Sequence, residues 1–349
     1  MSHVVVIGAG AVGCLSALEL AARGWKVTLV DKGALGAESS WAGGGILFPL
    51  LPWRYTEPVN RLALVGAAAY AHLSNELLQE TGIDPQYRPC GMLVKADFGG
   101  KVALDWCEAQ GIRAEMRDGD IWLPDVAQAR NPRLMQALRA MLHKRGVRVV
   151  EHTELVPLSE SGGAIRSWRS ADGDQFEADA YVVTAGAWSS KLLGVHAMHV
   201  QIKPMRGQML LYKLEPELLP NILYREDFYL IPRLDGHILG GSTVEDVGFD
   251  KSNTDDAMAS LAEKASALLP QLADAPIVQC WSGLRPGSPD NVPVIACHPQ
   301  FDNLWLNAGH FRYGVTMAPA SAKILVALMA GETHVAGDYS FPDGFSSGT

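Results

Sequence analysis

The chain has 349 residues, of which 48% are hydrophobic and 19% charged, and its formal net charge is −9. This composition excludes an intrinsically disordered chain, and the length is sufficient for two globular domains. The negative net charge argues against a nucleic-acid-binding surface. Because no apolar stretch reaches 18 uninterrupted residues, we predict no membrane span.

Cysteine and histidine usage bears on metal binding and on the cellular compartment. The cysteines are scattered and form no C-x-x-C pair, and no histidine has a metal-ligand spacing such as H-E-x-x-H, so no metal site is predicted. The first strand begins at once, which leaves no room for a signal peptide. We therefore expect free thiols and a cytoplasmic location. The cysteines are Cys14, Cys90, Cys107, Cys280 and Cys297.

Residues 3–13, HVVVIGAGAVG, predict a strand, a glycine-rich turn and the start of a helix. The helix ends near Gly24, and a second strand over 25–30 leads to Asp31. In a dinucleotide site, Gly8 makes the tight turn, Gly10 lets the backbone approach the pyrophosphate, and Gly13 permits close helix packing. Asp31 is placed to accept hydrogen bonds from a ribose. The alternative is an ordinary βαβ unit whose glycines serve packing only.

The next segments continue an α/β pattern. An amphipathic helix is predicted over 58–81, and its apolar stripe is formed by Leu62, Val65, Ala69, Leu73 and Leu77. Further predicted elements are a strand over 90–96, helices over 101–111 and 131–146, and strands over 147–156 and 178–188. The last of these reads as a buried strand that runs into a glycine turn, and it fits a parallel strand of the first sheet.

The middle of the chain has a different character. Residues 205–244 contain strand-like runs separated by turn residues, which predicts an antiparallel sheet, and a helix follows near 255–270. The first pattern then returns with a strand over 303–309 and a helix over 315–331. We therefore expect a nucleotide-binding domain assembled from separated segments, with a second domain inserted in pieces.

Several motifs resemble the FAD-dependent D-amino acid oxidase superfamily, and within it the ThiO-type glycine oxidase family. They are HVVVIGAGAVG, SSWAGGGILFPLLPW, AYVVTAGAWS, SGLRPGSPDNVPVI and GHFRYGVTMAP, and they run from the first strand to the last helix. The resemblance implies an α/β fold with a Rossmann-like (GR2-type) FAD-binding domain and a substrate domain built on an antiparallel β-sheet. We assign residues 1–85, 127–203 and 282–349 to the FAD-binding domain, and 86–126 and 204–281 to the substrate-binding domain.

The resemblance also implies the cofactor contacts. FAD would be bound non-covalently, since GLRPGSPD contains no cysteine and Cys280 is only a remote candidate for a covalent link. Asp31 stands where glycine oxidases usually have Glu and still offers two acceptor oxygens. Val156 would contact the adenine through its backbone, and the segment from His310 to Thr316 would wrap the flavin ring. The implied contacts are Gly8, Gly10, Ala11, Val12, Gly13, Asp31, Lys32, Ser39, Ser40, Gly44, Gly45, Ile46, Val156, His310, Phe311, Arg312, Tyr313, Gly314, Val315 and Thr316.

The residues support the last of these segments independently. Gly309 and Gly314 flank a turn that opens the final helix. A helix N-terminus there can stabilise negative charge on the pyrimidine edge of a reduced flavin. The alternative is a C-terminal helix that only packs on the sheet.

The substrate end is assigned to two arginines and a tyrosine. Arg285, between a predicted strand and a Pro-Gly turn, offers a planar fork to a carboxylate, with a structural salt bridge as the alternative. Tyr229 would donate its hydroxyl to the same carboxylate, unless it is a packing aromatic. Arg312 would be a second carboxylate contact or a gate. No side-chain base is proposed: the resemblance implies that a hydride passes from Cα to flavin N5 at about 3–3.5 Å, and His310 supports the turn.

The implied reaction is oxidation of glycine, sarcosine and small D-amino acids to the imine and then the 2-oxo acid, with O2 reduced to H2O2. The resemblance further implies a cytoplasmic homo-oligomer, a homotetramer, with a role in thiamine biosynthesis. The wording YGVTMA leans toward D-amino acid dehydrogenases, so transfer of electrons to a quinone stays open. A second alternative is an FAD-bearing subunit or tRNA-modification domain that acts with a partner chain.

Overall fold

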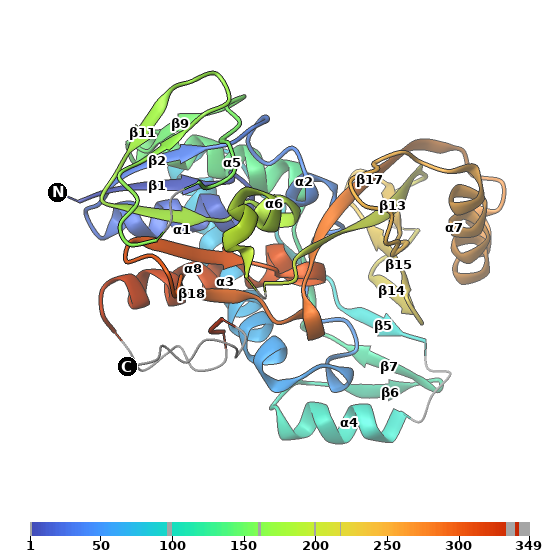
Figure 1. Ribbon diagram of the computed structural model, residues 1–349. Helices are drawn as coiled ribbons and strands as arrows, with labels where there is room; N and C mark the ends of the chain where they lie inside the picture. Colours follow the sequence, from blue (N-terminus) through green and yellow to red (C-terminus); the bar gives the residue numbers. More distant parts are fainter. Residues whose placement is uncertain are drawn as a thin grey trace.

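The computed structural model describes residues 2–95, 100–159, 162–198, 200–216, 218–332 and 339–341. Its first layer is a six-stranded sheet in the order β18-β19-β12-β1-β2-β9 (Figure 1). Five strands run parallel, and β18 pairs antiparallel with β19. The bounds are β1 His3–Ile7, β2 Lys26–Val30, β9 Arg148–Val150, β12 Ala180–Val183, β18 Val294–Cys297 and β19 Leu304–Ala308.

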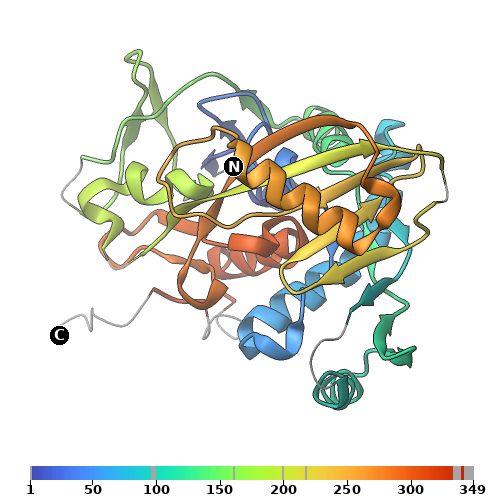
Figure 2. The ribbon, with the colours of Figure 1, turned by 90° about the vertical axis from the view of Figure 1, so that its right-hand side faces the viewer.

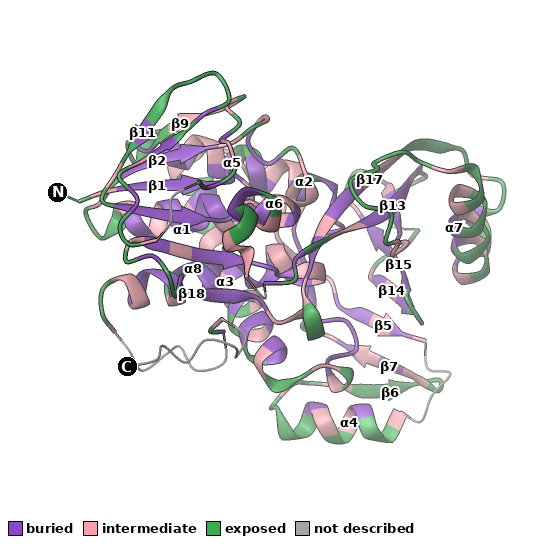
Figure 3. Ribbon diagram, in the orientation of Figure 1, coloured by how far each residue is buried: buried purple, intermediate pink, exposed green. Residues whose placement is uncertain are grey.

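Three helices pack against this sheet: α1 Ala11–Ala22, α5 Asn131–Lys144 and α8 Gly314–Met329. Helix α3, Glu57–Thr81, packs on α5 and α8. Apolar side chains of these helices and of the sheet form one buried cluster. Most of β1, α1 and α8 therefore has the colour of buried residues in Figure 3. A second cluster gathers the hairpin β10 Ser167–Arg169 and β11 Gln175–Glu177 and the short helix α6 Ser189–Leu193. The glycine turn predicted after β12 is a 3-10 helix, Gly186–Trp188.

The second large sheet has eight strands in the order β17-β13-β16-β15-β14-β5-β7-β6. All its pairings are antiparallel except that of β14 with β5. Helix α7, Asp255–Leu268, packs across it (Figure 2), and α4, Gly100–Ala109, packs at the β7 end. The bounds are β5 Met92–Val94, β6 Glu115–Arg117, β7 Asp120–Leu123, β13 Lys203–Lys213, β14 Ile222–Arg225, β15 Phe228–Pro232, β16 His237–Gly241 and β17 Ile277–Gly287.

A small third sheet has three strands in the order β3-β8-β4. It consists of Ile46–Leu47, Ala127–Gln128 and Arg88–Pro89. Its strand β3 follows helix α2, Ser39–Ala42, and the glycine-rich segment after that helix. The expected α/β fold class with a parallel nucleotide-binding sheet and an antiparallel second sheet is confirmed. The domain boundaries stay a prediction, and β17 crosses the one placed between 281 and 282.

Two sequence expectations about individual elements were wrong. The buried face of α3 includes Leu62, Gly66, Tyr70 and Leu77, whereas Val65 is 57% exposed. The face turned toward α8 is therefore defined by small and aromatic residues, which an apolar-stripe count does not weigh. The strand expected over 147–156 is also short, because the ladder with β2 ends at Val150. Of the strand expected over 90–96, Ala96 lies outside the described residues.

All five cysteines are free. Among the described residues, no helix combines the length and the apolarity that crossing a membrane requires.

Candidate functional site

One long cavity runs from the β1–α1 turn to the faces of β13, β15 and β17. It encloses about 1840 Å³, including open solvent at its mouth, and its walls come from residues between Ile7 and Thr316. Because its lining runs from the first glycine turn to the antiparallel sheet, the cavity suits an extended ligand. The carboxyl ends of β1 and β2 open into it, which is the usual place for a ligand in a sheet of this kind.

The first end of the cavity is a helix N-terminus. Helix α1 begins at Ala11 after Gly10, which has no side chain to cap it, and the Ala11 N–H donates to the Ser40 hydroxyl at 2.9 Å. A Cβ at Gly10 would lie 3.0 Å from that hydroxyl oxygen, so the turn and α2 approach closely. Backbone N–H groups and the helix dipole make this end suitable for a pyrophosphate.

Asp31, at the end of β2, is the acid beside this turn. Its carboxylate accepts hydrogen bonds from the backbone N–H groups of Ala9 (2.7 Å) and Gly33 (2.8 Å). Burial raises its pKa, and these two N–H groups oppose the rise. Each carboxylate oxygen has a further lone pair, so the ribose hydroxyls of a dinucleotide can still bind here.

Lys32 and Trp188 border the same end. The Lys32 ammonium lies 3.5 Å from the centre of the Trp188 ring, a cation–π contact. Both side chains line the cavity, and Phe249 packs on Trp188 with ring centres 5.3 Å apart. Trp188 was not among the residues predicted from the sequence, because a lone aromatic after a strand gives no local signal.

The central wall is the glycine segment after α2. Gly45 has φ of +77°, and a Cβ there would lie 2.1 Å from the Ala129 carbonyl oxygen, so only glycine fits. The partly buried Arg233 donates to the Gly44 carbonyl at 2.8 Å and to that of Ala129 at 3.1 Å. Burial lowers the pKa of Arg233 to about 10. Arg233 was missed by sequence reasoning, and it fixes the wall on which a flavin would rest.

Asn131, at the start of α5, is a second missed residue. It is fully buried, lines the cavity and donates to the Ser40 carbonyl at 2.8 Å. Its Oδ1 has no hydrogen-bond partner within the part of the chain that the structure describes. A buried amide oxygen without a partner costs free energy unless a ligand supplies a donor. The hydroxyl-rich chain of a flavin dinucleotide carries such donors, so this end fits the cofactor.

The opposite wall is formed by the start of α8. His310 bonds Ser321 at 2.8 Å, and its burial lowers its pKa to about 3, so the imidazole is neutral. Thr316 donates to the Ile46 carbonyl at 3.0 Å, and the Tyr313 hydroxyl bonds the backbone of Leu50. These contacts join the two walls, and the N-terminus of α8 lies at the cavity.

The sequence predicted that Arg285 follows a strand, whereas in the structure it lies within β17. The strand ladder extends through Gly287, because Pro286 pairs at a position where β13 contributes Pro204. Arg285 lines the cavity, and its guanidinium occupies the space that a Cβ at Gly207 would fill, 2.2 Å away. Burial lowers its pKa, with nearby Arg312 adding to the effect.

Arg285 has no carboxylate partner among the described residues, so the alternative of a structural salt bridge is absent there. The contrast is Arg206 on β13, which is 4% exposed and pairs with Glu245 at 2.5 Å and Asp250 at 2.6 Å. Arg285 is partly buried, and a cation removed from water without an internal counter-charge is costly unless a ligand brings an anion. The planar guanidinium has the geometry to bind a carboxylate.

Tyr229 and Arg312 complete this end of the cavity. Tyr229, on β15, is buried, and its hydroxyl lies 3.3 Å from the Ser242 hydroxyl and 3.6 Å from the Met209 sulfur. Arg312 is partly exposed, and its guanidinium lies 5.5 Å from the centre of the Phe311 ring. The side chains of Arg285, Arg312 and Tyr229 thus line the same cavity.

Nearly all the sequence-predicted site residues line this cavity. The exceptions are Gly13 and Val156. Gly13 lies behind the turn, where a Cβ would be 1.8 Å from the Gly8 carbonyl oxygen. The Val156 N–H donates to Arg169 and its carbonyl accepts from the Trp168 indole, while its neighbours Leu155 and Pro157 line the cavity.

A family model described as FAD dependent oxidoreductase matches residues 3–328. Glycine oxidase from Pseudomonas aeruginosa is 41% identical over 351 residues, covering 95% of this chain and 96% of that protein. The chain belongs to the FAD-dependent oxidoreductase family, in its glycine oxidase branch. Glycine oxidase from Pseudomonas putida is 39% identical, with 94% of each chain covered. This FAD-dependent oxidoreductase also matches the bifunctional protein ThiO/ThiG of Trichormus variabilis at 31% identity, covering 92% of this chain and 52% of that protein.

Solved structures agree on the fold of the oxidoreductase. Glycine oxidase from Geobacillus kaustophilus superposes with a TM-score of 0.89 at 24% identity, covering 99% of this chain and 100% of that one. Iminodiacetate oxidase from Chelativorans superposes with a TM-score of 0.84, also at 24% identity, covering 97% of this chain and 98% of that one. The uncapped α1, the Asp31 carboxylate and the unpartnered Asn131 oxygen all fit the FAD that the family requires.

Proposed function

We propose that this protein is an FAD-dependent glycine oxidase that acts on glycine, sarcosine and small D-amino acids. The observation that carries the proposal is the guanidinium of Arg285, which is only partly exposed and faces the cavity without a carboxylate partner among the described residues. A substrate carboxylate supplies the missing charge. The similarity to two Pseudomonas glycine oxidases supports the same substrate class.

The chain's own residues bind and orient the amino acid. Arg285 keeps one N–H on each terminal nitrogen, and its Nε–H, for the substrate carboxylate, because its other two terminal N–H groups contact Ser242 and Thr243. The Tyr229 hydroxyl lies close enough to share that carboxylate. Bound FAD would accept the hydride that leaves Cα of the amino acid. The catalytic contribution of the protein is then mainly orientation of Cα and exclusion of water.

No side chain is assigned as a general base. His310 lines the cavity, but it is engaged with Ser321, and its low pKa keeps it neutral. The amine must therefore arrive unprotonated, or lose its proton to solvent, before the hydride leaves. The N-terminus of α8 would stabilise the negative charge that reduction places on the cofactor.

We further infer that O2 is the electron acceptor, which is the acceptor implied by the name of the relatives. We also infer a cytoplasmic homo-oligomer, a homotetramer, with a role in thiamine biosynthesis. The similarity to a protein named ThiO/ThiG supports that role. Light scattering of the purified holoprotein tests the oligomeric state, and an apparent mass of one chain contradicts it.

Oxygen uptake by the purified holoprotein tests the main proposal. Glycine, sarcosine and D-alanine should be oxidised with formation of H2O2, and L-alanine should not be. With its carboxylate on Arg285 and its hydride toward the cofactor, L-alanine would place its methyl where the amine belongs. A higher kcat/KM for D-phenylalanine than for glycine would contradict the substrate assignment. Reoxidation by a quinone dye and not by O2 would contradict the oxidase assignment alone.

A further inference from the structure

The guanidinium of Arg285 is held from behind by the two residues that follow β16. Its Nη2 donates to the Ser242 hydroxyl at 2.6 Å, and its Nη1 donates to the Thr243 carbonyl at 3.1 Å. Ser242 is 6% exposed and is not among the residues that line the cavity. It therefore acts on a substrate only through the side chains it contacts.

The same hydroxyl also contacts Tyr229. The Tyr229 phenol lies 3.3 Å from the Ser242 oxygen, so one hydroxyl contacts both side chains assigned to the substrate carboxylate. A side chain with several rotatable bonds, such as that of arginine, loses conformational entropy when it binds a ligand. An anchor that fixes it in advance reduces that loss.

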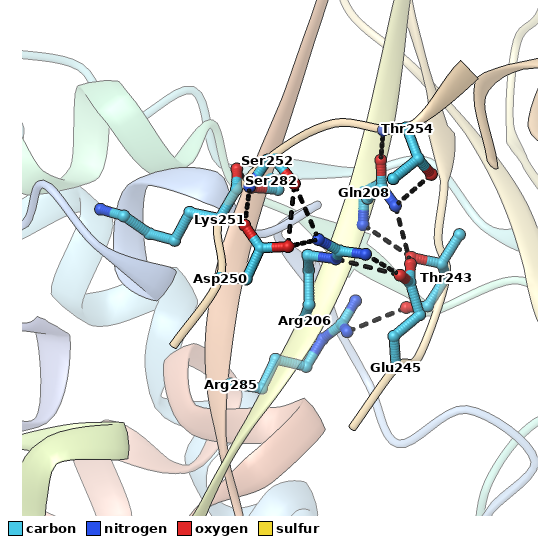
Figure 4. Close-up of polar contacts among 10 residues, drawn as sticks. All are labelled: Arg206, Gln208, Thr243, Glu245, Asp250, Lys251, Ser252, Thr254, Ser282 and Arg285. Atoms are coloured by element: carbon cyan, nitrogen blue, oxygen red, sulfur yellow. Dashed lines mark hydrogen bonds and ion pairs between the residues drawn. The ribbon is translucent and has the colours of Figure 1, made fainter. Parts of the chain in front are cut away.

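The anchor itself is fixed by a buried polar network on the other face of β13. Figure 4 shows Gln208 and Arg206 of β13 reaching the segment after β16, with Arg285 beside them. The Gln208 N–H donates to the Thr243 hydroxyl at 2.9 Å, and the Gln208 amide donates to Glu245 at 2.8 Å. Arg206 pairs with both Glu245 and Asp250, so the segment that carries Ser242 is tied to the sheet.

We propose that Ser242 is a positioning residue that holds Arg285 and Tyr229 in the orientation that receives the substrate carboxylate. The proposal rests on the proposed function and adds a residue to it. Ser242 contacts neither substrate nor cofactor, and its effect is on binding rather than on hydride transfer. Once a substrate is bound, its carboxylate itself holds the guanidinium.

The test is Ser242→Ala in the FAD-loaded enzyme. The KM for glycine and the Kd for acetate, read from the change in flavin absorbance, should each rise about tenfold, while kcat stays within about threefold. Ser170→Ala is the matched control, because Ser170 is 1% exposed, does not line the cavity, and its hydroxyl accepts the Asp174 backbone N–H rather than a bond from Arg285 or Tyr229. If the alanine variant does not fold, Ser242→Cys carries the same expectation, since its thiol keeps the shape but accepts hydrogen bonds weakly.

The outcomes separate this proposal from the function. A Kd for acetate and a KM for glycine within twofold of wild type would overturn the role of Ser242. Equal losses in kcat on glycine and on an amine without a carboxylate would also overturn it, since they indicate a general structural effect. A wild-type enzyme that does not oxidise glycine contradicts the proposed function, yet its acetate titration still tests Ser242.

Discussion

Arg285 and Arg206 lie on paired strands, Arg206 buried and Arg285 partly buried, yet among the described residues a counter-charge is present only for Arg206. Arg285→Ala should therefore abolish useful turnover of glycine while leaving the flavin spectrum unchanged. Loss of one partner from a desolvated charge pair costs about 2–5 kcal/mol, which is at least thirtyfold in kcat/KM. The measurement compares glycine with an amine that has no carboxylate. Equal losses on both would indicate damage to folding or cofactor binding.

Asp31 offers a second test at the opposite end of the cavity. Asp31→Ala should weaken FAD binding by about 1–3 kcal/mol, because both the ribose hydroxyls and two backbone N–H groups lose an acceptor. Once loaded with FAD, the variant should turn over glycine at nearly the wild-type kcat. The measurement is titration of apoprotein with FAD, and exposed Asp172→Ala is the control. Wild-type affinity in the Asp31 variant would remove its assignment as the ribose acid.

At this scale the sequence reveals residues that belong to short motifs. The first turn, Asp31 and the segment around His310 are local in sequence, so their positions in the cavity are predictable. The roles of Arg233, Asn131 and Ser242 are not predictable in this way, because each depends on a contact with a distant segment of the chain. Ser242 is 43 residues from Arg285 in sequence, and Arg233 is 189 residues from Gly44. Such contacts depend on how strands pair and carry no signature of spacing.

Among the elements, α3 and α8 approach each other closely at Gly66. A Cβ at Gly66 would lie 2.1 Å from the carbonyl oxygen of Thr316, which belongs to the segment assigned to the flavin. Gly66→Ala should therefore push the helices apart and lower the free energy of unfolding by about 1–3 kcal/mol. The affinity for FAD should fall as well. Urea unfolding and FAD titration measure the two effects.

Val65→Ala is the control in the same helix, because Val65 is 57% exposed. An unchanged FAD affinity in Gly66→Ala would show that α8 can shift without disturbing the site.

A second element-scale test concerns the joint between α5 and the end of β9. Glu151 accepts bonds from Arg139 at 2.6 Å and from the Leu35 N–H at 2.6 Å, and the Arg139 guanidinium lowers the pKa of Glu151 to about 2. A carboxyl group whose pKa is lowered in the folded state stabilises the fold at pH values above its unfolded-state pKa. This contribution is lost as the pH falls through the folded-state pKa. Glu151→Gln should cost about 1 kcal/mol near neutral pH, after allowance for solvent screening of the partly exposed pair.

The cost of Glu151→Gln should shrink as the pH falls from the ordinary Glu pKa of 4.5 toward about 2. Urea unfolding at a series of pH values measures it. The control is exposed Glu108→Gln, which should show no such dependence. A cost that grows toward acid pH would contradict the sign of the linkage.

The elements also show where sequence patterns fail. Helices α1, α3, α5 and α8 were predicted within a few residues, because a glycine lies at or just beyond the C-terminal end of each. The extension of β17 through Arg285, Pro286 and Gly287 was not, because proline and glycine disfavour strands locally. Here pairing with β13 along eleven residues outweighs that preference.

At the scale of the whole molecule, one cavity joins both large sheets through the glycine segment and α8. FAD should therefore stabilise the entire fold: a thousandfold excess over Kd adds about 4 kcal/mol to the free energy of unfolding. Thermal unfolding of apoprotein against FAD concentration measures this. FMN, which lacks the adenosine end that Asp31 would bind, should raise Tm less. A Tm independent of FAD would contradict the cavity assignment, and colour retained in acid-precipitated protein would contradict non-covalent binding.

The same span of the cavity has a consequence for synthesis of the protein on the ribosome. Its walls begin at Ile7 and end at Thr316 of a 349-residue chain, and β19 and α8 supply the last of them. A nascent chain carries the first nucleotide turn early, but the opposing wall is synthesised about 300 residues later. Stable capture of the cofactor therefore has to wait for α8, and until then the chain between the two walls exists without its cofactor.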